Sequence, residues 1–131
     1  MRHCCAILAI FSVILFSCDS NREPAYQKAY DEVMEIHDIV MPKMSDINKA
    51  KKQLRKLKTE ENNSIIDDQI QKLDEADEAM MSWMADFDKP NFENLQDNLN
   101  YLEKEKEKIS GVSDQMLSVI AESKDLISIY Q

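Results

Sequence analysis

Residues 26–57 read YQKAYDEVMEIHDIVMPKMSDINKAKKQLRKL and carry apolar or aromatic side chains at alternating steps of four and three. Such steps place these side chains on one side of an α-helix, in the pattern of a heptad seam. Lys51 interrupts the seam with a charge. We therefore expect one long helix whose buried side is formed by Tyr26, Tyr30, Val33, His37, Val40, Met44, Ile47 and Leu54.

Two later stretches, residues 66–87 and 92–130, repeat the same apolar spacing. Residues 59–63 predict a turn between the first and second helices, and residues 88–91 predict a break before the third. Short connections between long helices force neighbours to run antiparallel. The expected fold is therefore all-α, an antiparallel up-down-up three-helix bundle of coiled-coil type that occupies residues 24–131 as a single domain.

Several details of this bundle are also predicted. Ser64 and Asp67 have the spacing of a capping pair that would open the second helix. The second seam consists of Ile66, Ile70, Leu73, Ala76, Met80, Met84 and Phe87. The third consists of Phe92, Leu95, Leu99, Leu102, Ile109, Met116, Ile120, Ile127 and Tyr130, and its weak points are Lys106, Ser113 and Ser123.

The composition supports a helical, acidic protein. The chain has one Gly and three Pro, and its acidic residues exceed its basic residues by nine. Few helix breakers favour helices, and a negative surface disfavours binding to nucleic acid. We expect a soluble, self-repelling surface and no nucleic-acid partner.

The N-terminus has the features of a secretory signal. A positive head, residues 1–3, precedes a run without charge from Cys4 to Cys18, which is shorter than the roughly 20 residues of a membrane-spanning helix. Residues 15–18, LFSC, resemble the lipobox of bacterial lipoproteins. We therefore predict a signal peptide over residues 1–17 and a spacer over 18–23 that starts with Cys18 acylated by fatty acids such as palmitate.

This lipid would anchor the mature protein to a membrane of the cell envelope, on the periplasmic side or at the cell surface. The sequence does not distinguish between the inner and the outer membrane. Cys4 and Cys5 would leave with the signal, so the mature chain would have no free thiol. The alternative is an ordinary signal peptide in which Cys18 is incidental.

Methionine is concentrated around the single mature His and the single Trp. A fold centred on residues 60–61 would bring His37 opposite Met84 and Met41 opposite Met80. Thioether and imidazole groups prefer copper(I) or silver(I), and an indole face attracts a cation. The predicted ligands are His37, Met41, Met80 and Met84, with Met44 and Met81 as substitutes and Trp83 for the cation–π contact. The alternative is plain core, because methionine packs flexibly against aromatic rings.

Three further features were interpreted from their chemistry. Pro42 removes a backbone hydrogen bond and should kink or loosen the first helix. The basic run of residues 49–58 should complement the helix dipole and pair with acids across the turn, or else form a tip that docks a partner. Residues 103–108, EKEKEK, predict a solvated helix face with local ion pairs.

Catalytic motifs are missing from this sequence. The predicted mature chain has no free Cys, no second His and no glycine-rich phosphate loop. We therefore expect a protein that is not an enzyme. The first hypothesis is an envelope module that binds or scaffolds a protein partner through its helices, and the second is a soft-metal binder or copper sensor.

Residues 37–44, HDIVMPKM, and residues 74–84, DEADEAMMSWM, resemble a group of small lipoproteins from Bacteroidota. Automatic labels compare that group with a viral A-type inclusion protein. The resemblance covers most of the mature chain. It implies a coiled-coil helical fold and a lipid anchor, and it implies no particular activity.

Overall fold

The computed structural model of this chain describes residues 22–131, so the predicted signal peptide and the anchor at Cys18 lie outside the described residues. Within the described part, four α-helices and one short 3-10 helix follow one another. They are α1 (Arg22–Val40), η1 (Met41–Lys43), α2 (Met44–Leu57), α3 (Asn63–Asp86) and α4 (Leu95–Tyr130).

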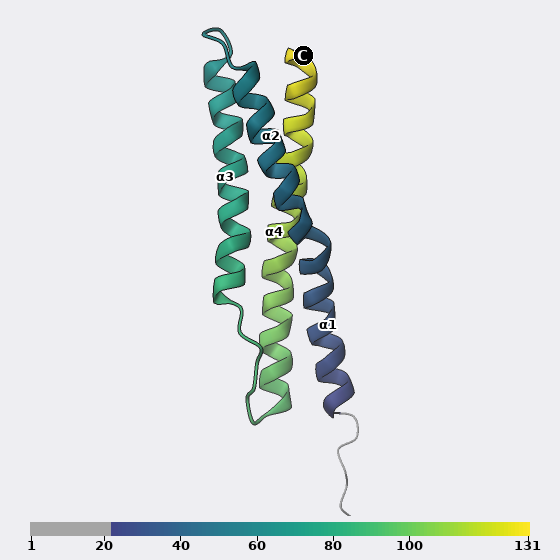
Figure 1. The fold of residues 1–131 in the computed structure, drawn as a ribbon. Coiled ribbons are helices and arrows are strands. Elements are labelled where there is room, and N and C mark those ends of the chain that lie inside the picture. Colours follow the sequence, from purple (N-terminus) through teal and green to yellow (C-terminus); the bar gives the residue numbers. More distant parts are fainter. Residues whose placement is uncertain (1–21) are drawn as a thin grey trace, which may run out of the picture.

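The helices form three antiparallel rods, which confirms the predicted up-down-up bundle (Figure 1). The first rod consists of α1, η1 and α2, the second is α3, and the third is α4. The long α4 packs against α1, α2 and α3, and α2 also packs against α3. The pair α1 and α3 is not among these principal contacts, so the first rod meets the second mainly through its α2 half.

The first rod is divided at Pro42, as the sequence predicts. Proline has no backbone N–H and its ring crowds the preceding turn, so the α-helical hydrogen-bond pattern cannot continue through it. Here the chain tightens into η1 with Pro42 in its first turn, and α2 starts directly afterwards at Met44. Because of this division, α1 follows α4 while α2 packs between α3 and α4.

The core is a single column of apolar side chains along the bundle. Its members all lie between Val33 and Ile127, and they include the fully buried Ile47, Leu54 and Leu73. Burial of each such side chain contributes about 1.5–3 kcal/mol. Gln69 adds one polar layer, because its buried amide donates hydrogen bonds to Ser123 Oγ at 3.0 Å and to Val119 O at 3.2 Å. The column, complete within residues 33–127, holds the three rods together.

The predicted seams are largely correct, and Lys51 shows how a charge fits into one of them. Its side chain is buried, and its ammonium group donates to Asp74 Oδ1 at 2.9 Å and lies 3.4 Å from Asp77 Oδ2. The basic run therefore does pair with acids of α3, here and through Lys58, which contacts Asp67 at 2.6 Å. Two helices are joined by ion pairs at this end of the bundle.

The turn between α2 and α3 differs from the expectation in its capping. We predicted that Ser64 and Asp67 would form a capping pair, and this is wrong, because α3 already begins at Asn63. Asn62 closes the turn instead. Its Oδ1 accepts from Thr59 N at 2.6 Å, and its Nδ2 donates to Leu57 O at 3.0 Å. One buried asparagine thus satisfies one carbonyl that the end of α2 leaves free and one amide of the turn.

The start of the third rod also differs from the expectation. Phe92 was predicted to belong to its seam, but α4 begins three residues later at Leu95, and Phe92 is 51% exposed. Asn94 caps the helix by accepting from Gln96 N at 2.7 Å. Asn98 donates to Phe92 O and accepts from Phe92 N, each at 2.9 Å, and these bonds hold the preceding segment out of the helix.

None of the helices described over residues 22–131 is long and apolar enough to cross a membrane.

Candidate functional site

The predicted meeting of His37 and Trp83 is confirmed. His37 on α1 and Trp83 on α3 bring their rings to a centroid distance of 5.7 Å with a tilt of 34°. The Nδ1 atom of His37 lies 2.9 Å from Asp38 Oδ1. Within the described chain Nε2 has no such partner, so it is the ring nitrogen that a ligand would meet.

Trp83 is held in place by a carboxylate from the third rod. Its indole Nε1 donates to Glu105 Oε2 at 3.1 Å, and both side chains are buried. Lys108 donates to the other oxygen, Glu105 Oε1, at 2.6 Å, and this hydrogen bond raises the pKa of Lys108. The indole is therefore fixed by a charged acceptor, which is a stronger bond than a neutral one.

This contact corrects our interpretation of residues 103–108 as a solvated face. Glu105 stands three residues after Leu102 and four before Ile109, which is the spacing of the core, and it is 3% exposed. Lys106 crosses to the first rod and contacts Glu32 Oε2 at 2.7 Å. The seam spacing indicates that Glu105 is buried, but we interpreted the alternating charges of this stretch as an exposed face.

The six predicted metal ligands do not share one environment. Met80 is fully buried, while Met41, Met44 and Met84 are partly buried and pack against the core. Met81 is 52% exposed and is not part of that packing. His37 has a side chain that is 18% exposed. The structure thus brings His37 and Trp83 together, packs four of the methionines against the core and leaves Met81 outside it.

Within residues 22–131, no group of three or more His, Cys, Asp and Glu side chains is arranged to hold a metal ion. Thioether sulfur is not among those ligand types.

Aromatic rings continue from Trp83 toward the start of α1. Trp83 stacks on Phe87 at 4.9 Å between centroids, Phe87 lies 6.3 Å from Tyr30, and Tyr30 lies 6.3 Å from Tyr26. Aromatic pairs at such distances attract each other beyond the effect of burial. These rings, with His37, are the contacts by which α1 meets α3. The heptad spacing predicted Tyr26, Tyr30 and Phe87 in seams, but it placed Met84 where the structure buries Trp83.

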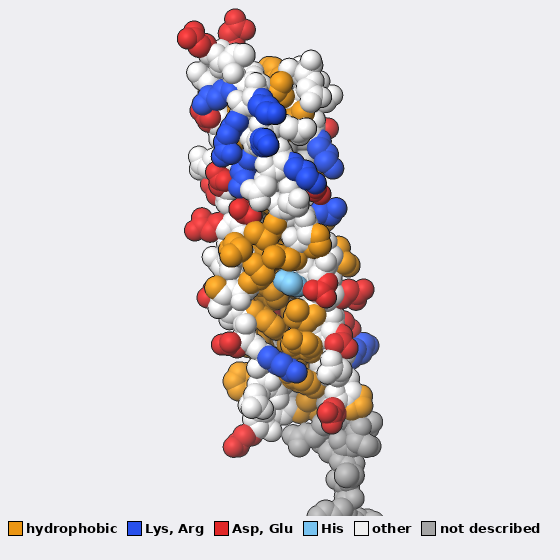
Figure 2. Space-filling view, in the orientation of Figure 1, with side chains coloured by type: hydrophobic (Ala, Val, Ile, Leu, Met, Phe, Trp, Pro, Cys, Tyr) orange, Lys and Arg blue, Asp and Glu red, His pale blue; other side chains and the backbone are white. Residues whose placement is uncertain are grey.

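These ring contacts are covered in part: Trp83 is buried, and Lys89 Nζ lies 5.0 Å from the centroid of the Tyr30 ring. Figure 2 shows hydrophobic side chains gathered in a strip on this face, around a histidine. We call it the apolar strip and define it by partly or fully exposed residues of both rods. The ring contacts place Tyr30, His37 and Phe87 in it, and helical spacing adds Met34 and Met41 from the first rod and Met84, with Met81 at the edge, from the second.

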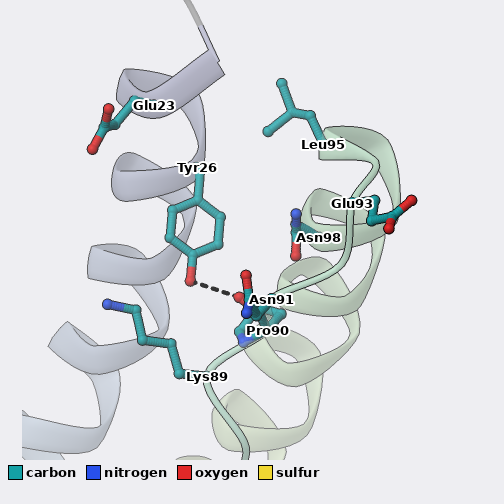
Figure 3. A pocket seen from close by; sticks show the side chains of 8 residues that line it. All are labelled: Glu23, Tyr26, Lys89, Pro90, Asn91, Glu93, Leu95 and Asn98. Atoms are coloured by element: carbon teal, nitrogen blue, oxygen red, sulfur yellow. Dashed lines mark hydrogen bonds between the residues drawn. The ribbon is translucent and has the colours of Figure 1, made fainter.

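An open cavity of about 550 Å³ lies near the lower end of this strip (Figure 3). Tyr26 crosses it and donates to Pro90 O at 3.0 Å, and Lys89 and Asn98 form part of its wall. Burial raises the pKa of Tyr26, and the nearby Tyr30 adds to that effect. The sequence did not predict the cavity, because α1, the segment after α3 and the start of α4 build it together.

Glu32 and Lys106 form an ion pair between the first and third rods. The hydrogen bond from Lys106 and its positive charge lower the pKa of Glu32, and the same hydrogen bond raises the pKa of Lys106. Both side chains are more than one third exposed, so solvent screens the pair. It ties α1 to α4, on which α1 mainly packs.

Comparison with known proteins identifies no relative. No family model matches the chain, and neither a curated protein nor a solved structure is similar to it.

Proposed function

We propose that this protein is a lipid-anchored module of the bacterial cell envelope that binds a protein partner and catalyses no reaction. The anchor is inferred from residues 1–18, in which a short apolar run precedes LFSC. The lack of a catalytic motif in the sequence supports a binding role. The observation that carries the binding proposal is the apolar strip between α1 and α3.

Solvent contact of this strip is unfavourable unless something binds there. Its methionine and aromatic side chains gather on one face of an otherwise strongly charged molecule (Figure 2). Exposed apolar patches with polar surroundings commonly mark sites of protein interaction. The single exposed apolar residues elsewhere, such as Ile39 at 62% and Ile129 at 72%, do not form such a strip and need no function.

The proposal is tested by site-specific photo-crosslinking in the native envelope. A photoreactive residue in place of Met84 samples the strip, and the same residue in place of Ile39 samples the opposite side of α1. We expect a discrete adduct from position 84 that is absent from position 39. Equal labelling from both positions, or no adduct from position 84, would exclude the strip as a partner-binding surface.

A second candidate function is binding of copper(I) or silver(I). One observation favours it, namely the ring contact of 5.7 Å between His37 and Trp83 within a group of methionines. Nε2 of His37 and the sulfur atoms of Met41, Met80 and Met84 supply a soft ligand set. The Trp83 ring next to His37 would shield a bound cation from water and attract it through its face.

Anaerobic titration with copper(I) or silver(I) tests this second function. Binding should change Trp83 fluorescence, leave metal on the protein after desalting and raise its melting temperature as the metal concentration rises. His37→Ala should remove these effects, as should the double change Met41→Leu/Met84→Leu, which nearly preserves hydrophobic volume. A flat fluorescence signal with no retained metal would show that these residues are core only.

A further inference from the structure

We infer that the apolar strip is the docking site of an amphipathic helix whose apolar face is bordered by Lys and Arg. This inference rests on the proposed binding function and names the class of partner. It is carried by the shape of the strip, by the flexibility of its side chains and by the charges beside it.

The shape suits a helix. Tyr30, Met34, His37 and Met41 follow one another at steps of four, three and four residues, so they form a straight line along the first rod. On α3, Phe87 lies 6.3 Å from Tyr30 between ring centroids, and Met84 and Met81 precede it at steps of three residues, so this side turns gradually around the helix. An apolar face shared by two neighbouring helices is where a further helix packs in a bundle. Its length, at 1.5 Å per residue from Tyr30 to Met41, accommodates roughly three to four turns of a partner.

The side chains suit a surface that adapts to its ligand. Four of the seven strip residues are methionines, which are unbranched and polarizable and which repack against different apolar partners. Trp83 lies buried beneath them, fixed by its bond to Glu105, and His37 contacts its ring. The exposed methionine side chains of the strip can therefore change conformation, while the buried Trp83 is held in place.

The charges select the sign of the partner. Asp31 and Asp38 on α1 each follow a strip residue directly and are exposed, and Glu78 and Asp88 are exposed on the α3 side. Figure 2 shows acidic side chains on both sides of the hydrophobic strip and one basic side chain across its lower part. Lys89 Nζ lies 5.0 Å from the centroid of the Tyr30 ring, so the acidic borders act on the part of the strip from Met34 to Met41. A helix seated there would place its flanking residues opposite these carboxylates, so Lys and Arg are attracted and Asp and Glu are repelled.

A second copy of the chain fits this strip poorly. The chain carries a net charge of −9, and the borders of its own apolar face are acidic. Two strips brought face to face would oppose carboxylate to carboxylate along their length. Basic flanks on a different protein avoid this repulsion.

The experiment uses the chain from Asp19 to Gln131, which keeps every core residue of the bundle. Two synthetic 16-residue peptides without Trp share one leucine stripe and differ only in their flanks, which are Lys in one and Glu in the other. Trp83 emission and peptide helicity report binding. At low salt we expect the Lys-flanked peptide to bind at least about tenfold more tightly, which is a difference of about 1.4 kcal/mol. The preference should shrink at high salt.

Variants locate the binding and its charge selectivity. Asp31→Lys/Glu78→Lys should reverse the preference toward the Glu-flanked peptide. Asp114→Lys/Asp125→Lys changes the net charge equally on the exposed outer side of α4 and should leave the preference in place. Met84→Glu should weaken both peptides, whereas Ile39→Glu on the opposite side of α1 should not. Circular dichroism of each variant verifies that the bundle is intact.

Equal binding of the two peptides, or no binding of either, would overturn the inference. Self-association of the chain that Met84→Glu abolishes would overturn it too, because the occupant would then be a second copy. These outcomes are separate from the crosslinking test at position 84. An adduct there together with failure of the Lys-flanked peptide would mean that the strip binds a protein of another kind.

Discussion

Nε1 of Trp83 donates a hydrogen bond of 3.1 Å to Oε2 of Glu105, which joins the second and third rods inside the core. A buried bond to a charged acceptor is worth about 1.5–3 kcal/mol. A double-mutant cycle with Trp83→Phe and Glu105→Met, each of which removes one partner of the bond, should therefore give a coupling free energy of about 1–2 kcal/mol. Urea unfolding followed by circular dichroism measures it, since fluorescence is lost with Trp83. Additive effects of the two changes would mean that the bond contributes nothing to stability.

Removal of the acids that face Lys51 should destabilise the upper half of the bundle. Asp74→Asn/Asp77→Asn leaves a buried ammonium group without a counter-ion, and we expect a loss of about 1–3 kcal/mol in the free energy of unfolding. Lys51→Met in that double variant should restore much of the loss, because the stranded charge is then gone.

The exposed pair of Lys58 and Asp67 serves as the control for this prediction. Asp67→Asn should cost less than about 1 kcal/mol, since surface ion pairs are weak. Chemical denaturation of these three variants and the unsubstituted chain under one set of conditions makes the comparison. If Lys51→Met failed to recover stability, the cost would come from the acids themselves and not from the buried cation.

The pair of Glu32 and Lys106 should make stability depend on pH. The folded pKa of Glu32 is lowered from its ordinary value of 4.5, so its contribution is present above that value and is lost as the pH falls through the folded pKa. The pKa of Lys106 is raised from 10.5, so its contribution is lost only as the pH rises through that raised value. Glu32→Gln should therefore flatten the decline in urea midpoint below about pH 4.5.

Glu107→Gln is the matched control for that change, because Glu107 is exposed and has no ion pair in the part of the chain that the structure describes. It removes the same charge from the surface. The pair-specific effect should also weaken at high ionic strength. An identical pH profile for both variants would assign the effect to net charge alone.

Processing at Cys18 is predicted from the sequence and is open to a direct test. Cys18→Ala should give a product that is not acylated, is not cleaved at residue 17 and no longer partitions into detergent. Phase separation and mass spectrometry of the N-terminal peptide measure both changes. Cys5→Ala, within the predicted signal, should be processed normally. Normal cleavage and lipid partition of Cys18→Ala would show that the lipoprotein assignment is wrong.

Local spacing explains why so much of the bundle was predictable. Helical periodicity depends on residues three and four apart, so the seams, the break at Pro42 and the turn before α3 could be predicted from short stretches. The centre of that turn also determines which residues of the first and second rods lie opposite each other. For this reason we expected the regions around His37 and Trp83 to meet.

The incorrect expectations have two causes, which are dependence on partners distant in sequence and local side-chain hydrogen bonds that have no periodic pattern. Burial of Glu105 requires the indole of Trp83, 22 residues earlier, and burial of Lys51 requires acids more than 20 residues later. The start of α4 was placed too early at Phe92, because the bonds from Asn98 that hold this residue outside the helix leave no periodic signal.

The sequence by itself determined the three rods, their antiparallel order and the side that each presents to its neighbours, because hydrophobic spacing is a local property of the chain. Only the tertiary structure decided that α1 packs mainly on α4 and meets α3 through aromatic side chains, so that methionines and rings stay partly exposed between them. The physical reason is that a seam predicts burial but does not state which helix covers it. With the first rod broken at Pro42, the three rods do not cover every seam along the whole length of the bundle.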